Sequence, residues 1–339
     1  MRAKSPWSPR LLRILTKLTA RLPYAEAQAV LEELAGIRVS LSSGWRIAQT
    51  WGAQFQVELE RETATQKAAA QTWSTPGERP DPHQRMGGAL DGAMIDIRGE
   101  GWKEFKVGCI YDVELEERSD PTTGDRGEFG HAVRISYVAH LGGPQTFGWQ
   151  LWTEAQRRGW QKAIATQLLG DAAVWIWNLQ QEHFPDSVAL VDWFHAVEHL
   201  GEAKLLLYPQ EGAPASQWYH KHEQALYQGH AEEVARSLQA SAGKITDTTQ
   251  SEALQKAAAY FKNNRDRMHY QEMREEGWPI GSGAVESGAK QFKARVTGPG
   301  MRWSRSGADH MLTLRAAVLT GDQRFDELWS RAYANLPPS

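Results

Sequence analysis

The first part of the chain carries apolar residues at helical spacing. From Tyr24 to Ala35 every third or fourth position is apolar, and Gly36 follows as a residue type that commonly ends a helix. A second, short helix is predicted from about Ser42 to Trp51. Two helices joined by a glycine turn are the parts of a helix-turn-helix that reads a major groove. Small helical hairpins are also common in proteins without that role.

The next stretch, 53–88, is polar and rich in Gln and Ala, and it is interrupted by Pro76, Pro80 and Pro82. This composition predicts a helix followed by a linker. We therefore expect a domain boundary at about 80–88.

From Ala89 the pattern changes to stretches rich in Val, Ile, Tyr and Phe, separated by glycine-containing turns. They predict three consecutive strands, at 89–98, 102–113 and 131–141. The elements predicted next are a helix at about 153–163, a strand ending at Leu169, a helix carrying Trp175, Ile176 and Leu179, and a strand at 187–192.

Residues 195–273 are almost purely helical in pattern, with two long stretches at 216–241 and 250–275. A closing helix is expected after the GlySerGly run at 281–283. Strands and helices that alternate in this way predict a mixed α/β layer architecture, interrupted by a helical block.

Composition narrows the class of protein. Hydrophobic residues make up 41% of the 339 positions, which suits a folded domain. No apolar run approaches the length of a membrane span, and no apolar segment typical of a secretory signal follows the charged N-terminus. Cys109 is the only cysteine, so no intrachain disulfide can form. These features predict a cytoplasmic protein that does not enter a membrane.

The net charge of −3 argues against simple electrostatic binding to nucleic acid, but the charges are unevenly distributed. Residues 1–25 hold six basic residues and no acid, and the segment 281–339 holds eight basic residues against five acids. We expect the two ends to face DNA, although basic runs are also common on ordinary solvated surfaces.

Three acids occupy positions where such a fold could bring them together. Asp91 lies on the first predicted strand, Asp171 follows the fourth, and Glu286 lies on the closing helix. Three carboxylates about 5 Å apart would repel by roughly 3 kcal/mol per pair at an effective dielectric of about 20. Bound cations would offset this cost, and oxygen ligands favour Mg²⁺ or Mn²⁺. A single acid of this kind is more often a turn former or a surface charge.

Six segments, in order along the chain, resemble the Kra-type transposases of bacterial insertion sequences: ALDGAM (89–94), WKEFKVG (102–108), GDAAVWIWN (170–178), VDWFHAVEHL (191–200), GSGAVES (281–287) and GMRWS (300–304). The resemblance runs from about residue 20 to residue 330. It implies an RNase H-like mixed sheet flanked by helices, and a DDE enzyme that cuts and joins DNA with two Mg²⁺ (or Mn²⁺) ions. It also implies that Asp91, Asp171 and Glu286 are the catalytic residues and the metal ligands. One departure is Ala172, because the family usually has glycine after the second Asp.

Asp192 is the rival for the second acid. It ends the fifth predicted strand, and with His195 it forms an Asp-x-x-His pattern similar to one found downstream of the second catalytic Asp in related transposases. His195 could contact the scissile phosphate or position a metal-bound water. It could equally be a structural histidine beneath the helical block.

The closing helix also offers a basic face. Glu286, Lys290 and Lys293 are spaced to share one side of it, so the two lysines could hold DNA phosphates beside the metals. An ordinary Glu–Lys pair on a helix has the same spacing. The DNA surface predicted from these residues extends to Arg295, Arg302, Trp303 as a ring for an extruded base, and Arg46 in the second helix.

The predicted organisation has four parts. Residues 1–80 form a helical, helix-turn-helix DNA-binding module with its linker, and 89–194 form the first part of the RNase H-like core. Residues 195–275 form an all-α insertion, and 276–339 form the closing helix and a basic C-terminal tail. The expected partners are the terminal inverted repeats and the target DNA. Because two element ends must meet, a homodimer or larger assembly is expected.

Two other functions compete with this one. His195, Glu198 and His199 match H-x-x-E-H, the pattern of some zinc peptidases, but it supplies no clear third ligand. A transposase-derived protein without catalytic activity, retained for DNA binding, would have the same sequence features.

Overall fold

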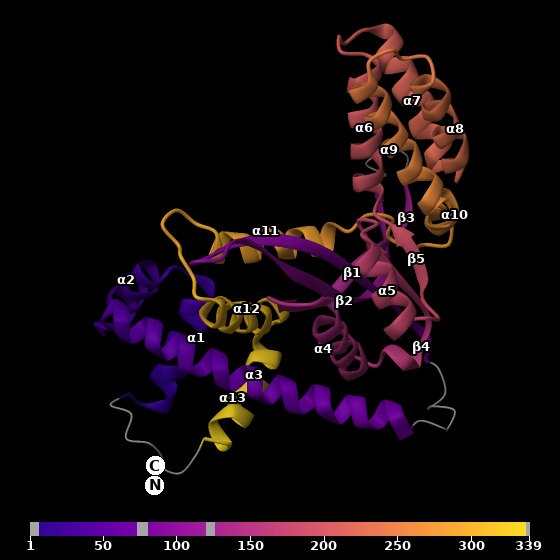
Figure 1. The fold of residues 1–339 in the computed structure, drawn as a ribbon. Coiled ribbons are helices and arrows are strands. Elements are labelled where there is room, and N and C mark those ends of the chain that lie inside the picture. Colours follow the sequence, from indigo (N-terminus) through magenta and orange to yellow (C-terminus); the bar gives the residue numbers. More distant parts are fainter. Residues whose placement is uncertain (1–6, 73–80, 120–125, 337–339) are drawn as a thin grey trace.

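In the computed structural model, which describes residues 7–72, 81–119 and 126–336, a five-stranded mixed sheet carries helices on both faces (Figure 1). The strand order is β3-β2-β1-β4-β5. The predicted α/β class is therefore confirmed. The strands are β1 (Asp81–Ile97), β2 (Gly101–Ser119), β3 (Arg126–His140), β4 (Ala163–Gly170) and β5 (Val188–Val191).

The sheet has an antiparallel half and a parallel half. Strands β1, β2 and β3 form an antiparallel meander, whereas β4 pairs parallel with both β1 and β5. All five strands lie in the predicted order, and the meander strands are longer than their apolar patterns indicated because their polar ends continue the pairing.

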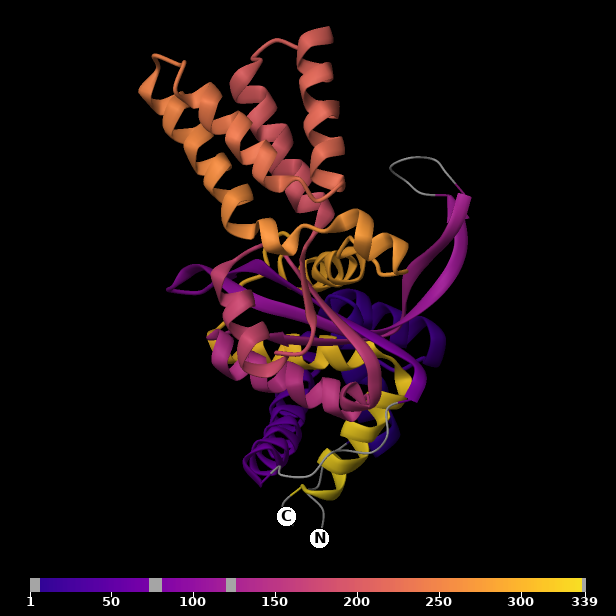
Figure 2. The same cartoon turned by 90° about the vertical axis from the view of Figure 1, so that its right-hand side faces the viewer.

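Helices cover the two faces of the sheet from different parts of the chain. Helix α11 lies on one face, and α4 and α12 lie on the other (Figures 1 and 2). Four helices surround the sheet: α4 (Pro144–Arg157), α5 (Val174–His183), α11 (Gly283–Val296) and α12 (Arg305–Thr320).

The position predicted for the helix before β4 was wrong. Instead of 153–163, α4 begins at Pro144, a residue whose fixed φ suits the first helical turn. The chain then turns at Gly159, which has a φ of +89°, and a short 3-10 helix, Trp160–Lys162, leads into β4. The segment after Gly159 is therefore already part of the approach to the sheet.

A helical block separates β5 from α11 and stands apart from the sheet at one end of it (Figure 1). Residues 195–273 are helical except for their turns and caps, as predicted. The block consists of α6 (Trp193–Leu207), α7 (Ala213–Tyr227), α8 (Ala231–Ala242), α9 (Thr248–Asn264), a 3-10 helix (Arg265–Arg267) and α10 (Tyr270–Glu275).

The N-terminal helices are α1 (Pro9–Arg21), α2 (Tyr24–Ala35) and α3 (Leu41–Thr72). The predicted second helix, Ser42 to Trp51, is only the first part of α3. Gly52 lies within α3 without interrupting it. A β-carbon at this position would lie 2.6 Å from Cβ of His310, so the glycine permits a close crossing with α12. Of the stretch 53–88 predicted as a helix and a linker, the helix is the rest of α3, residues 73–80 lie outside the described residues, and β1 already begins at Asp81, within the predicted boundary at 80–88.

The N-terminal helices share a hydrophobic core with the end of the chain. The ring of Trp51 stacks on Trp329 of α13 (Asp322–Ala334), with 3.8 Å between centroids, and Phe55 contacts Phe325. The chain ends therefore pack together beneath the sheet (Figure 1).

Much of the basic N-terminal segment is helix α1, and several of its cations are paired within the protein. Arg13 binds Asp326 at 2.6 Å, and Lys17 and Arg21 lie 2.6 and 3.7 Å from Asp322. These acids of α13 offset the positive charge of the segment, and its contact with DNA stays a prediction. The first basic residues of the chain, Arg2 and Lys4, lie outside the described residues.

None of the helices that the structure describes combines the length and apolarity needed to cross a bilayer.

The turn from β4 to α5 contains a strained residue. Ala172 has a φ of +75°, in the left-handed region that favours glycine. A glycine would adopt this conformation without the steric strain of a β-carbon.

We predict that Ala172→Gly raises the free energy of unfolding by about 1 kcal/mol, because relief of left-handed strain exceeds the entropy that glycine adds to the unfolded chain. Urea denaturation monitored by tryptophan fluorescence measures this. Ala165→Gly, within β4 and without positive φ, should instead lower stability by about 0.5–1 kcal/mol. Equal effects of both changes would contradict the role of strain.

Candidate metal centre

The parallel half of the sheet places three acids side by side. Leu90 of β1 is in register with Gly170 of β4, and Gly170 is in register with Val191 of β5. The next residue in each case is an acid: Asp91, Asp171 and Asp192. Asp91 is within β1, whereas Asp171 and Asp192 directly follow β4 and β5, so the register brings the three acids to the same end of the parallel strands.

Asp91 is half-buried on β1, and its Oδ1 accepts a hydrogen bond of 2.7 Å from the N–H of Gly92. Burial raises the pKa of the Asp91 carboxyl, and the negative charge of Asp171 raises it further. The positive charges available from His195 and Lys293 act in the opposite direction but do not reverse the shift. Asp91 and Asp171 therefore repel each other at close range.

Asp171 follows β4 directly, and its Oδ1 accepts a 2.9 Å hydrogen bond from the N–H of Ala173. This local turn holds the carboxylate at the start of α5 and leaves it partly exposed.

Asp192 is fully buried and has a different surrounding. Its Oδ1 accepts a 2.9 Å hydrogen bond from the N–H of His195, which caps α6. Its Oδ2 accepts from the N–H of Ser282, in the turn before α11. Asp192 thus joins three segments: the end of β5, the start of the helical block and the start of α11.

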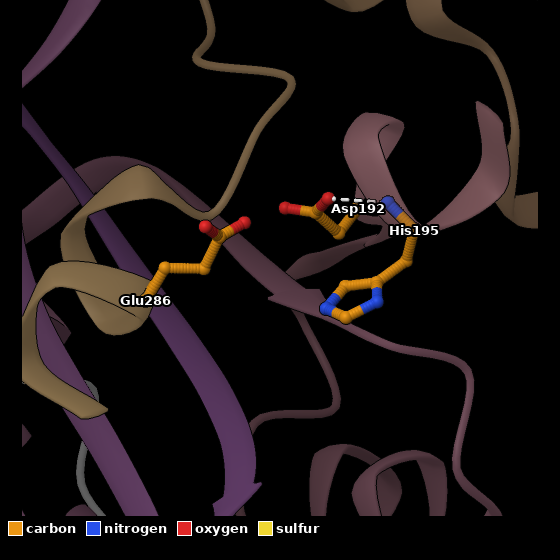
Figure 3. A group of neighbouring side chains, drawn as sticks. All are labelled: Asp192, His195 and Glu286. Carbon is orange, nitrogen blue, oxygen red and sulfur yellow. Dashed lines mark hydrogen bonds between the residues drawn. The ribbon is translucent and has the colours of Figure 1, made fainter. Parts of the chain in front are cut away.

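Asp192, His195 and Glu286 form a compact group in which one possible ligand atom from each lies within 4.8 Å of the others. In Figure 3 the carboxylates of Asp192 and Glu286 point toward each other, with the His195 ring beside them. Two carboxylates and an imidazole are suitable ligands for a divalent cation. This group contains the rival acid Asp192, whereas Asp91 and Asp171 approach each other on the neighbouring strands.

Glu286 extends from the first turn of α11, and its carboxylate lies 3.6 Å from Nζ of Lys290. Lys290 and Lys293 are both exposed, as are the more distant Arg302 and Arg46. These four cations are therefore accessible to a partner.

Two residues expected to contact DNA are buried, which corrects that expectation. Trp303 is 6% exposed, and its Nε1 donates a 2.8 Å hydrogen bond to the carbonyl of Val296. Arg295 is 1% exposed and donates to the carbonyl of Thr19 at 2.8 Å, at the end of α1. Its guanidinium also lies 5.5 Å from the centre of the Trp303 ring. Both side chains join helices and cannot reach a partner.

The H-x-x-E-H pattern does not assemble a second group of this kind in the described part of the chain. His195 belongs to the group with Asp192, while the ring of His199 lies 4.1 Å from that of Tyr260. Glu198 is largely exposed, 3.8 Å from Nδ1 of His195.

Tyr260, on α9, is a residue that sequence reasoning missed. Its hydroxyl is buried and has no hydrogen-bond partner among the described residues. Burial raises the pKa of this phenol, and the negative charges of Asp171 and Asp192 raise it further, so the hydroxyl keeps its proton and can donate a hydrogen bond. No local pattern marks it, because α9 reaches the acids only through the packing of the helical block.

We predict that Asp192→Ala lowers the free energy of unfolding by about 2–5 kcal/mol, because two backbone N–H groups lose their acceptor. Asp171→Ala removes one partly exposed hydrogen bond and should cost only about 1 kcal/mol. Chemical denaturation of the metal-free protein measures both. A larger loss in Asp171→Ala would show that Asp192 is not the structural junction.

A pH dependence follows from the raised pKa of Asp91. The folded state holds the proton of Asp91 more tightly than the unfolded chain does. The stability that this protonation contributes is therefore present in acid and is lost as the pH rises from the ordinary Asp range through the raised pKa. We predict that metal-free Asp91→Asn is more stable than the wild type at neutral pH, and that the difference vanishes in acid. Denaturation curves at several pH values test this; a difference independent of pH would contradict it.

Comparison with curated proteins finds no match to this chain. A family model matches residues 156–332, a span that contains Asp171, Asp192, His195 and Glu286 but begins after Asp91. This span covers more than half of the sequence, and the chain therefore belongs to the uncharacterised protein family UPF0236.

Proposed function

We propose that this chain is a DNA transposase of the DDE type, which cuts and joins DNA with two Mg²⁺ or Mn²⁺ ions. One observation supports this above the others. Asp91 lies on β1, Asp171 and Asp192 directly follow β4 and β5, and Glu286, from a helix distant in sequence, lies beside Asp192. Clustered acids are costly unless cations offset their charge.

The topology supports an RNase H-like core of the Kra-type kind. The first acid lies on β1, the second follows β4, and Glu286 lies on a late helix. A helical block separates β5 from that helix, which is the arrangement that the resemblance implies. The sheet order β3-β2-β1-β4-β5 places β1 at the centre, so Asp91 lies between the antiparallel and parallel halves.

The donor set fits divalent cations. Asp91 and Asp171 would supply oxygen ligands from the sheet, and Glu286 would supply them from α11, with Asp192 and His195 on the adjacent side. When bound, two such ions would activate an attacking hydroxyl and stabilise the leaving oxygen of a phosphodiester. His195 would accept or donate a proton beside them, and Tyr260 would donate a hydrogen bond.

The exposed cations define where DNA would lie. Lys290 and Lys293 follow Glu286 along α11 and would hold phosphates next to the acids. Arg46 and the half-exposed Trp45, at the start of α3, would contact DNA as part of the proposed helix-turn-helix. Because two element ends must be brought together, the active form would be a dimer or a larger assembly.

We predict that the wild type nicks end-labelled DNA from the flanks of its own gene, where the terminal repeats of an insertion sequence lie, in the presence of Mg²⁺ or Mn²⁺. Glu286→Gln should reduce nicking by about 100-fold or more while leaving DNA binding intact, because it removes a charged ligand. Gel electrophoresis of the products and a binding assay on the same DNA measure both.

Glu252→Gln is the matched control, since Glu252 is exposed on α9 and outside the compact group. It should nick like the wild type. Binding without nicking by the wild type would instead favour a catalytically silent DNA-binding protein. Peptidase activity lost in Glu198→Gln would favour the zinc peptidase.

A further inference from the structure

A groove runs beside the candidate metal centre, between the β2–β3 hairpin, the start of α6 and the connection from α10 to α11. Among the described residues, no carboxylate lines it, although acids outnumber basic residues by 41 to 38 in the chain. Arg274 and His131 are the lining residues in this described part whose side chains can carry a positive charge. The lining is dominated by six aromatic rings, those of Tyr111, Phe129, Tyr137, Trp193, Phe194 and Trp278.

Most of these rings form a buried floor, and two are accessible. Trp193 and Trp278 are each 3% exposed, whereas Phe194 is 50% exposed and Phe129 is partly exposed. The guanidinium of Arg274 lies 4.9 Å from the centre of the Phe129 ring, so a positive charge accompanies an aromatic surface at the rim.

The wall that holds Phe194 is fixed by backbone contacts. The N–H of Trp193 donates a 3.0 Å hydrogen bond to the carbonyl of Ile280. Two residues later, the N–H of Ser282 donates to the carboxylate of Asp192. Gly281 lies between these contacts, and a β-carbon there would lie 2.5 Å from the Phe194 ring. The ring therefore packs directly on the backbone of the turn.

The groove and the acids are built on the same segments. Phe194, which lines the groove, lies between Asp192 and His195 in the sequence, and Ser287, which also lines it, follows Glu286. A ligand seated on the rings would thus contact the two helix starts, of α6 and α11, that carry members of the candidate metal centre.

We propose that this groove binds an unpaired nucleotide of a DNA strand, with its base stacked on Phe194 and Phe129 and its phosphate near Arg274. The inference rests on the proposed function and names a substrate feature of the same site. Flat aromatic surfaces accept the π-face of any base, and a base can present that face only when it leaves its stack. A lining without carboxylates avoids repulsion of the phosphate.

The test uses the full chain and a fluorescein-labelled thymidine 12-mer, compared with a duplex of the same length, with fluorescence anisotropy measured in EDTA. Phe194→Leu keeps an apolar side chain but removes the ring. It should weaken single-strand binding by about 10-fold and duplex binding much less. Phe194→Trp should restore it. Leu205→Ala, which removes another exposed apolar side chain of α6, is the control and should bind like the wild type.

Unchanged single-strand binding in Phe194→Leu would overturn the proposal. So would a change in sedimentation of Phe194→Leu with DNA binding intact, because the groove would then be an interface between copies of the chain. Wild-type protein that binds the single strand through Phe194 but never nicks DNA would retain the groove and refute the transposase. If nicking is lost in Glu286→Gln while Phe194→Leu binds the single strand like the wild type, the transposase is supported and the groove proposal is refuted.

Discussion

The parallel register of β1, β4 and β5 is the constraint on which the candidate site depends. Because Leu90, Gly170 and Val191 lie in line across the three strands, the acids that follow them come to the same end of the parallel half of the sheet. Burial and mutual repulsion oppose this arrangement, as the raised pKa of Asp91 shows. The cations of the proposed function would offset this electrostatic cost.

Asp192 connects that register to the rest of the molecule. Its two oxygens accept from the backbone of α6 and of the turn before α11, so the helical block and Glu286 are both positioned from the end of β5. The same residue lies within reach of His195 and Glu286. Asp192 is therefore both a structural junction and a member of the candidate metal centre, whereas Asp171 is held only by its own turn. As second acid of the proposed enzyme, the two candidates are thus a buried junction and a partly exposed carboxylate.

Buried arginines connect the two ends of the chain. Arg295 and Arg315 donate to the last carbonyls of α1, at Thr19, Ala20 and Arg21, which a helix end leaves without internal partners. Burial lowers the pKa of both guanidinium groups, and neither can serve a nucleic-acid partner. Lys290 and Lys293 are exposed on α11, the helix that also carries Glu286. Because Arg295 and Arg315 are buried, the basic surface is narrower than the composition of the C-terminal segment suggests.

Local sequence determined much of the fold. Period-two stretches marked the strands, Gly36 in the left-handed conformation ended α2, and GlySerGly preceded α11. These features depend on neighbours in the chain, so they can be recognised without the tertiary structure. In the same way, the sequence alone places Asp91 on a predicted strand and Asp171 and Asp192 at the ends of two others.

Tertiary structure alone decided which side chains could act. Trp303 and Arg295 have the chemistry of DNA contacts, yet packing between α1, α11 and the turn before α12 buries them. Tyr260 and the aromatic groove come from segments far apart in sequence that meet only when the helical block and the hairpin are in place. Periodicity is a property of one segment, whereas burial and proximity are properties of pairs of segments. For that reason the sequence identified the acids but could not assign their partners.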